Sequence, residues 1–314
     1  MSLKNFNSKY KTEITEKTEE LDALGKKIGD DGLKALCSIK FQKLKQLLLE
    51  ENSISNIDVL EKNNFGNNLE ALDLSSNKIT SINVLAKVKF PSLNHLFLNS
   101  NQISSIDIFA TTNFPTLKEL NLSSNKISSI DIFEKVNFAQ LKNLDLSKNQ
   151  IIKIDVLSRV KFPNLEELML DQNKISSIDI LVKFSCDKLK KLKLEKNNLK
   201  NIDILEKIQF NKLNYLSIGD DTLGDKVDCL TKIKFGELED IYLYLNDSID
   251  RETEKIQRIV SHFEDKGITF NFISCDDDND NDINLDDDLN DGGGRSNANN
   301  AGGGLDFLLN SDVF

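Results

Sequence analysis

One short pattern returns along this chain at an almost constant spacing, and it constrains the fold more than any other feature. Residues 117–138, LKELNLSSNKISSIDIFEKVNF, are one copy. A unit of about 24 residues cannot bury an apolar face alone, whereas stacked units bury a continuous core. The chain is therefore predicted to form a solenoid. Aligned on one polar position, the copies lie 24 or 25 residues apart, with that position at Asn52, Asn77, Asn101, Asn125, Asn149, Asn173, Asn197, Asp221 and Asn246.

The first half of each unit, LxxLxLxxNxI, predicts a short strand followed by a turn. Leu117, Leu120 and Leu122 alternate along such a strand, and the nine copies are expected to pair side by side in one parallel sheet. The amide of Asn125 can donate and accept, so stacked asparagines can satisfy backbone groups in the turns. An ionised aspartate only accepts, which predicts an altered turn at Asp221.

The second half of each unit, IxxIDΦΦxxxxFxxL with Φ apolar, predicts a helical turn on the outer face. An aspartate or asparagine precedes the apolar pair and is expected to cap that turn, at Asp58, Asn83, Asp107, Asp131, Asp155, Asp179, Asp203 and Asp228. A later phenylalanine is expected to stack with its equivalents as a spine, at Phe41, Phe65, Phe90, Phe114, Phe138, Phe162, Phe210 and Phe235.

Four segments follow from these patterns. Residues 1–32 are expected to be an N-terminal segment and cap, 33–249 the repeats, and 250–275 a C-terminal cap. In this last segment a helix, capped by Asp250 and ended by Gly267, precedes a strand at 268–273. Residues 276–314 form an Asp-, Asn- and Gly-rich tail.

The tail carries almost all of the charge imbalance. It holds −10 of the formal −11, so residues 1–275 are close to neutral. Such a segment cannot bury enough apolar surface to order itself, and disorder is expected. Its apolar end is expected to be a short binding motif, and the acidic part could contact lysines of the repeats at 190, 191, 193 and 196. The motif residues are Leu305, Phe307, Leu308, Leu309 and Phe314.

The recurring LxxLxLxxNxI resembles the leucine-rich repeat superfamily over residues 33–246. This resemblance implies an α/β solenoid: a curved right-handed superhelix with a parallel β-sheet on its concave face, short helical turns on its convex face, and partners usually bound on the concave face. The IxxI spacing is similar to that of intracellular repeat proteins that regulate protein phosphatase 1, and partly to bacterial internalins. The acidic tail resembles that of the acidic nuclear phosphoproteins.

Patterns for catalysis, cofactors or metal ions are missing from the sequence. His95 and His262 are the only histidines, and neither has a nucleophile or carboxylate at a recognisable spacing, so an enzyme is not expected. Cys186 and Cys229 occupy positions that are apolar in other copies, which indicates small buried side chains. No stretch of the sequence has the length and apolarity of a signal peptide or membrane span, so a cytoplasmic or nuclear location is expected.

Two outward positions in each strand differ from copy to copy and can therefore specify a partner. Large apolar, aromatic and charged residues on this face are the candidate contacts, and the aromatic ones are expected to be exposed. They are His95, Phe97, Glu167, Met169, Lys191, Lys193, Tyr215, Tyr242 and Tyr244.

We expect a non-catalytic scaffold that binds a protein partner on the concave face. Two alternatives stay open: a regulatory subunit of a protein phosphatase, and an acidic-tailed binder or chaperone of basic proteins such as histones. Nucleic-acid binding is not expected, because the folded part lacks a broadly basic face.

Overall fold

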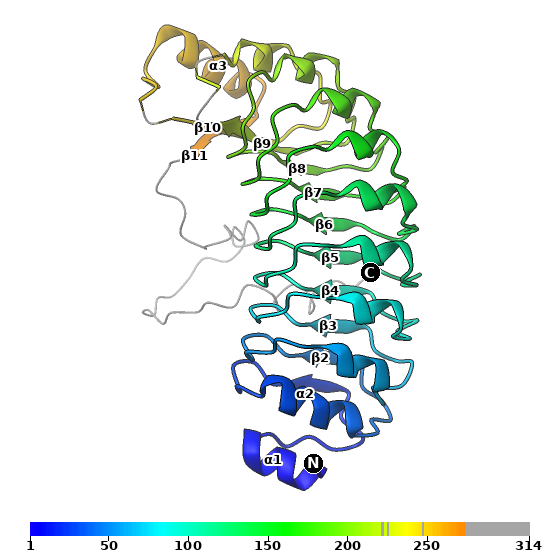
Figure 1. The fold of residues 1–314 in the computed structure, drawn as a ribbon. Coiled ribbons are helices and arrows are strands. Elements are labelled where there is room, and N and C mark those ends of the chain that lie inside the picture. The colour runs from blue at the N-terminus through cyan, green and yellow to red at the C-terminus, as the bar shows by residue number, and fades with distance from the viewer. Residues whose placement is uncertain (221–222, 225, 247, 274–314) are drawn as a thin grey trace. The chain divides into compact units, whose positions relative to one another are not determined.

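The computed structural model describes residues 1–220, 223–224, 226–246 and 248–273, and residues 1–272 form one compact unit. Within the described residues one sheet contains eleven strands in sequence order (Figure 1), and β1 to β10 pair in parallel. Asp221, the tail and its end motif (Leu305, Phe307, Leu308, Leu309 and Phe314) lie outside the described residues. The strands are β1 Glu20–Asp22, β2 Gln46–Leu48, β3 Ala71–Asp73, β4 His95–Phe97, β5 Glu119–Asn121, β6 Asn143–Asp145, β7 Glu167–Met169, β8 Lys191–Lys193, β9 Tyr215–Asp220, β10 Asp240–Leu245 and β11 Thr269–Ile273.

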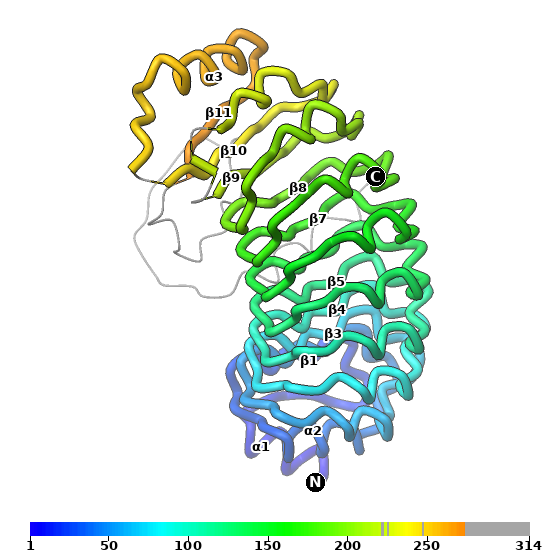
Figure 2. The backbone as a smooth tube through the Cα atoms, turned by 45° about the horizontal axis from the view of Figure 1, so that its top comes forward, coloured from blue at the N-terminus to red at the C-terminus, as the bar shows by residue number. Residues whose placement is uncertain are grey.

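Helical turns line the side of the stack opposite the sheet (Figure 2). Helical turns take more room along the stack than strands, which are about 4.8 Å apart, so the sheet lies on the concave side. No helix among the described residues is both long and apolar enough to cross a membrane. The α-helices are α1 Leu3–Tyr10, α2 Gly29–Ser38 and α3 Glu254–Glu264, and the 3₁₀-helices are η1 Asp58–Lys62, η2 Asn83–Ala86, η3 Asp107–Ala110, η4 Asp131–Lys135, η5 Asp155–Ser158, η6 Asp179–Lys183, η7 Asp203–Lys207 and η8 Asp228–Lys232.

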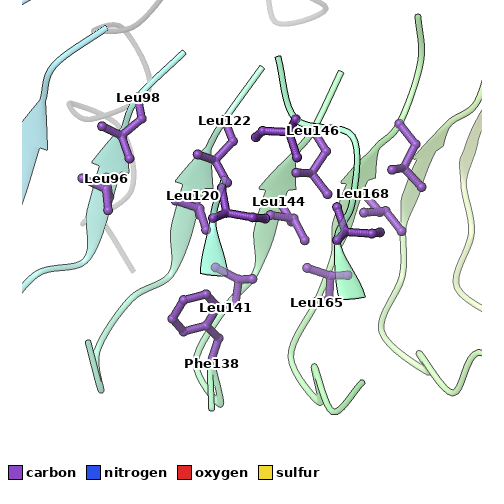
Figure 3. Close-up of a cluster of buried hydrophobic side chains, with 14 of the residues drawn as sticks. Leu96, Leu98, Leu120, Leu122, Phe138, Leu141, Leu144, Leu146, Leu165 and Leu168 are labelled. Carbon is purple, nitrogen blue, oxygen red and sulfur yellow. The ribbon is translucent and has the colours of Figure 1, made fainter. Parts of the chain in front are cut away.

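The core is a stack of equivalent leucines between the sheet and the helical turns. Leu120 and Leu144 lie beside each other on β5 and β6, with Leu122 and Leu146 two residues further on, and all four are fully buried (Figure 3). All eight spine phenylalanines are buried, as expected. The expected stacking is incomplete, because rings from the outer turns intervene. Phe133, for example, meets Phe162 edge-on with ring centroids 5.8 Å apart.

The repeated geometry of the turns depends on the asparagine of each unit, as predicted. The Asn125 amide nitrogen donates to the carbonyl oxygens of Leu98 (2.9 Å), Leu122 (3.1 Å) and Ser123 (3.0 Å), and its oxygen accepts from the Ile103 N–H (2.9 Å). Each asparagine therefore ties its own turn to the preceding repeat. The amides that donate in the same way belong to Asn77, Asn101, Asn149, Asn173 and Asn197.

β9 is longer than the strands of the preceding repeats, and Asp221, where the sequence predicts an altered turn, lies outside the described residues. In the preceding repeats the residue before the asparagine adopts a left-handed conformation, for example Lys196 with φ of 53°. At β9 the strand continues instead, and Asp220 is fully buried. Its Oδ2 accepts from the Leu199 N–H at 3.2 Å, as the ladder asparagines do in other turns.

The predicted helix caps are wrong both at the 3₁₀-helices and at α3. In the eight described 3₁₀-helices the aspartate or asparagine is the first helical residue, so the residue before it takes the N-cap position. No side chain at that N-cap position forms a capping hydrogen bond. That preceding residue is an isoleucine or valine whose side chain must enter the core. In α3 the cap is Thr253, whose hydroxyl accepts from the Ile256 N–H at 3.4 Å, whereas Asp250 accepts from Glu252 one turn earlier.

Both ends of the stack are covered by helices. At the start, α1 buries Phe6 and Tyr10, and β1 extends the sheet into the segment that the sequence assigns to the N-terminal cap. At the other end, α3 buries Ile256, Ile259 and Phe263. Gly267 lies just beyond the end of α3 and adopts a φ of 72°, as predicted for the residue that stops this helix.

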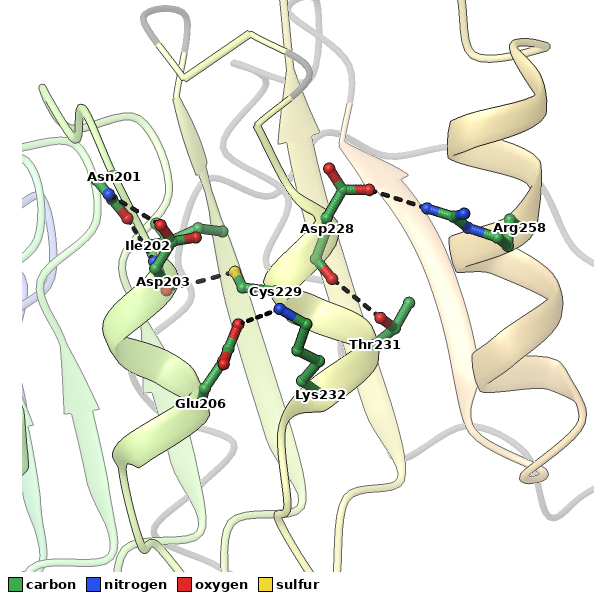
Figure 4. Close-up of polar contacts among 9 residues, drawn as sticks. All are labelled: Asn201, Ile202, Asp203, Glu206, Asp228, Cys229, Thr231, Lys232 and Arg258. Carbon is green, nitrogen blue, oxygen red and sulfur yellow. Dashed lines mark hydrogen bonds and ion pairs between the residues drawn. The ribbon is translucent and has the colours of Figure 1, made fainter.

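Ion pairs join α3 to the last repeat. Asp228 in η8 accepts from Lys255 at 2.9 Å and from Arg258 at 3.1 Å, and the Arg258 contact is shown in Figure 4. The hydrogen bond from Lys255 lowers the pKa of the Asp228 carboxyl. These contacts hold the C-terminal cap against the repeats.

Candidate functional site on the concave face

Two rows of outward side chains cross the concave face in register. Residues one repeat apart lie side by side at about 4.8 Å. The first concave row is Gln46, Ala71, His95, Glu119, Asn143, Glu167, Lys191, Tyr215 and Asp240. The second concave row is Leu48, Asp73, Phe97, Asn121, Asp145, Met169, Lys193, Ser217 and Tyr242. The candidate contacts of the sequence fall in these rows, except Tyr244, which lies two residues beyond Tyr242.

His95 and Phe97 form a group with the next strand. His95 Nδ1 lies 3.0 Å from Oε2 of Glu119, and its ring stacks on Phe97 with centroids 6.3 Å apart. The expectation that His95 lacks a carboxylate partner is therefore wrong, because the partner is at the same position one repeat later. Phe97 is only 6% exposed, so the expected exposed aromatic is absent here. Its row neighbours Asp73 and Asn121 flank it.

Tyrosines and lysines gather at β8 to β10. The rings of Tyr215 and Tyr242 stack with centroids 5.0 Å apart, and Lys191 Nζ lies 5.1 Å from the Tyr215 ring centre. Burial raises the pKa of Tyr215, and the charge of Glu195 raises it further. Tyr244 is only 4% exposed, which contradicts its predicted exposure, and Lys196 Nζ lies 5.3 Å from its ring centre.

A third row, two residues beyond the second, contains acidic residues that sequence reasoning missed. Asp171 and Glu195 are 7% and 8% exposed. Among the described residues, Asp171 Oδ1 and Glu195 Oε2 are buried without a hydrogen-bond partner, and so is the Ser217 hydroxyl. The third row could have revealed them, because the four preceding copies carry only serine or asparagine there: Ser75, Asn99, Ser123 and Ser147.

Asp73, a buried aspartate elsewhere on the concave face, has hydrogen-bond donors for the oxygen that stays without one in Asp171 and Glu195. Asp73 Oδ1 accepts from the Ser75 N–H at 2.8 Å and also from its hydroxyl, although burial raises the Asp73 pKa. The second-row residues equivalent to Asp73 are Met169 in β7 and Lys193 in β8. Neither side chain can accept a hydrogen bond like the one that Asp73 accepts from Ser75. The local pattern of side-chain bonds therefore breaks at Asp171 and Glu195.

The electrostatics of the acid pair follow from burial. Desolvation raises the pKa of Asp171, and the charges of Glu195 and Asp145 raise it further, whereas Lys193 opposes them. Burial also raises the pKa of Glu167, and Lys191 opposes that change. The face therefore presents carboxyl groups that gain from a nearby positive charge.

Metal chemistry and thiol chemistry find no support in the described residues. No group of three or more histidine, cysteine or acidic side chains there could hold a metal ion. Cys37, Cys186 and Cys229 are buried and unpaired, and burial raises the pKa of each thiol to about 12. The predicted burial of Cys186 and Cys229 is confirmed, and Cys229 donates weakly to the Ile202 carbonyl (Figure 4).

Comparisons with known proteins agree with this geometry. Family models described as "Leucine rich repeat" match residues 67–82 and 91–151, and one described as "Leucine Rich repeats (2 copies)" matches residues 139–183. A sequence search of curated proteins finds no match.

Three solved structures are similar to this chain. The APL1 leucine-rich repeat domain has 21% identity and a TM-score of 0.51, covering 82% of this chain and 60% of that one. Internalin InlF of Listeria monocytogenes has 19% identity and a TM-score of 0.44, covering 88% and 83%. InlJ of the same organism has 21% identity and a TM-score of 0.48, covering 82% and 54%, so this chain spans about half of the InlJ structure. The family matches therefore identify leucine-rich repeats within residues 67–82 and 91–183, and the chain shares the fold of the APL1 leucine-rich repeat domain.

Proposed function

We propose that this protein is a non-catalytic scaffold that binds a protein partner on its concave face. The observation that carries the proposal is the gathering of aromatic, charged and unpartnered polar side chains over β7 to β10. Aromatic rings and desolvated charged groups supply most of the binding energy in protein interfaces. The stacked Tyr215–Tyr242 pair, with Lys191 against it, provides a rigid contact of this kind.

The difference between buried and outward positions supports the same proposal. The leucines of the strands recur because they fill the core, whereas the two concave rows change residue type at almost every repeat. A solenoid needs no such variation to fold, since each repeat contacts only its neighbours. Variation at the outward positions of the concave face is what a surface fitted to a particular partner requires.

Capture of partners with the full-length chain tests this proposal. The Tyr215→Ala/Tyr242→Ala variant removes the ring pair, and we expect it to lower the affinity for a captured partner at least tenfold. Ile152→Ala/Val182→Ala is the matched control, because both side chains are exposed and lie outside the concave rows. Equal loss with both variants, or loss with the control alone, would contradict binding on the concave face.

Two narrower versions of the function make different predictions in the same assay. A phosphatase regulator would retain a phosphatase that is lost with the tyrosine variant. A binder of basic proteins that acts through the acidic tail would lose its partner as salt rises, because exposed charges are screened beyond about 8 Å at physiological ionic strength.

A further inference from the structure

Two buried carboxyl groups lie in neighbouring repeats on the concave face, and one oxygen of each lacks a hydrogen-bond partner among the described residues. Met169 and Lys193 pair in register, and the Gln172 N–H donates to the Glu195 carbonyl at 2.9 Å. Asp171 and Glu195, two residues beyond the ends of β7 and β8, therefore lie on adjacent backbone segments about 4.8 Å apart. Asp171 Oδ1 and Glu195 Oε2 accept no hydrogen bond from any described residue. A buried acceptor without a donor is unfavourable, and most native structures avoid it.

Two of the nearby lysines have other contacts, whereas the charge of Lys193 opposes the rise in the Asp171 pKa. Lys190 is paired with Glu166 at 2.6 Å, and Lys191 lies against the Tyr215 ring. Within the described part of the chain, Lys193 forms no ion pair with an acidic side chain within 4.0 Å. The charges of Asp145 on β6 and Lys193 on β8 act on Asp171, and Tyr215 on β9 is affected by both acids and by Asp240 and Tyr242 on β10.

An aromatic ring completes the group. The charges of both acids act on the Tyr215 hydroxyl, so its ring lies close to them. Tyr215 is half-buried and stacks on Tyr242, which fixes its orientation. Met169 and Lys193, both half-exposed and flexible, flank the acids on their own strands and can move aside for an incoming group.

We propose that Asp171 and Glu195, with the Tyr215 ring beside them, bind one arginine side chain of the protein partner. This inference rests on the proposed function and names the chemistry of the partner. A guanidinium group has donors on several edges, so it can bridge oxygens of two carboxylates. It also stacks on aromatic rings and is only weakly hydrated, which suits a buried position. An ammonium group is a more strongly hydrated point charge and bridges less well.

Binding of arginine must be linked to proton release. Burial and the neighbouring carboxylates raise the pKa of Asp171 to about 8, so the free protein holds a proton there at neutral pH. A guanidinium favours the ionised form, and arginine itself stays charged throughout this range. We therefore expect affinity to rise by up to about tenfold per pH unit below pH 8 and to level off above it.

The test uses the full-length chain and a short Gly/Ser peptide with one central arginine. The probe is titrated to about 20 mM while the ¹³C shifts of the Asp171 and Glu195 carboxyl carbons are followed, and we expect a Kd on the order of 1 mM. Matched peptides replace arginine with neutral citrulline or with lysine, and both should bind at least tenfold more weakly. No shift at either carboxyl, or equal binding of citrulline or lysine, would overturn the assignment.

Paired variants test whether the peptide binds at these two carboxyl groups. Asp171→Asn/Glu195→Gln should weaken the arginine peptide at least tenfold, whereas the exposed pair Asp155→Asn/Glu70→Gln should leave its affinity unchanged. Arg295→Ala removes the only basic residue of 276–314 and should also have no effect. Tighter peptide binding to Arg295→Ala would mean that the chain's own arginine occupies the site. That result would contradict the proposal that the site binds an arginine of the partner.

Partner capture distinguishes failure of this inference from failure of the proposed function. If Tyr215→Ala/Tyr242→Ala weakens capture and Asp171→Asn/Glu195→Gln does not, the arginine site is wrong and the concave scaffold stands. If neither variant weakens capture, the concave face is not the binding surface.

Discussion

Asp171 is a single residue that departs from its repeat and changes the chemistry of the sheet face. Its folded-state pKa is raised from 3.8 by burial and by Glu195, so the folded protein keeps a proton that the unfolded chain releases. For an acid with a raised pKa, stability is greatest below the unfolded value and is lost as pH rises through the folded value. The pH range concerned runs from about 4 to about 8.

Replacing Asp171 by asparagine should remove this loss. We expect Asp171→Asn to be more stable than the wild type at pH 8, by on the order of 1–3 kcal/mol, with the gain shrinking toward pH 4. Urea unfolding across this range measures it. The exposed Asp155→Asn should change stability by no more than about 0.5 kcal/mol at any pH. A loss of stability at pH 8 in Asp171→Asn would show that the carboxylate is charged and well partnered.

Individual side chains on the concave face were only partly predictable from the sequence. The repeat period gave the register of both rows, and with it the neighbours of Tyr215. Exposure was not predictable for Phe97 and Tyr244, because it depends on side chains one repeat away. Asp171 and Glu195 were missed because the strand pattern covers two outward positions, while their row lies beyond the strand ends.

The asparagine ladder is the element that joins one turn to the next, and Asn149 tests its contribution. Its amide donates to the carbonyl oxygens of Leu122, Leu146 and Ser147 at 2.9–3.1 Å and accepts from the Ile127 N–H at 3.0 Å. Asn149→Ala leaves these buried backbone groups without partners. We expect a loss of about 3–5 kcal/mol in unfolding free energy.

Asn143 is a matched control for this measurement, because it has the same side chain in the same repeat but faces outward in the first concave row. Asn143→Ala should change the unfolding free energy by no more than about 0.5 kcal/mol. Equal effects of the two substitutions in chemical denaturation would show that the ladder bonds add nothing beyond those available from water.

At the scale of elements, strands were predictable and helix ends were not. Alternating leucines give β2 to β10, since only one face of each strand can enter the core. β1 escaped notice because Glu20–Asp22 has a single core residue and lacks the following asparagine. The capping error at the 3₁₀-helices arose because burial of the preceding isoleucine outweighs the preference of aspartate for the cap.

The molecule as a whole should behave as a row of coupled units, with its ends as the weak points. Phe263 on α3 is almost fully buried and stacks on Phe270 of β11 with centroids 5.5 Å apart, so it seals the last repeat. In a structure stabilised by nearest-neighbour contacts, damage at one end frays locally.

Phe263→Ala should therefore lower amide hydrogen-exchange protection in β9 to β11 and leave β2 to β5 close to wild type. Phe162→Ala removes an equally buried ring from the middle of the stack, and each substitution should cost about 3–5 kcal/mol locally. Phe162→Ala should reduce hydrogen-exchange protection in the repeats on both sides of Phe162, because each central repeat depends on neighbours in both directions. Uniform loss across all strands in both variants would show instead that the repeats unfold as one cooperative unit, since local fraying could not reach β2 from α3.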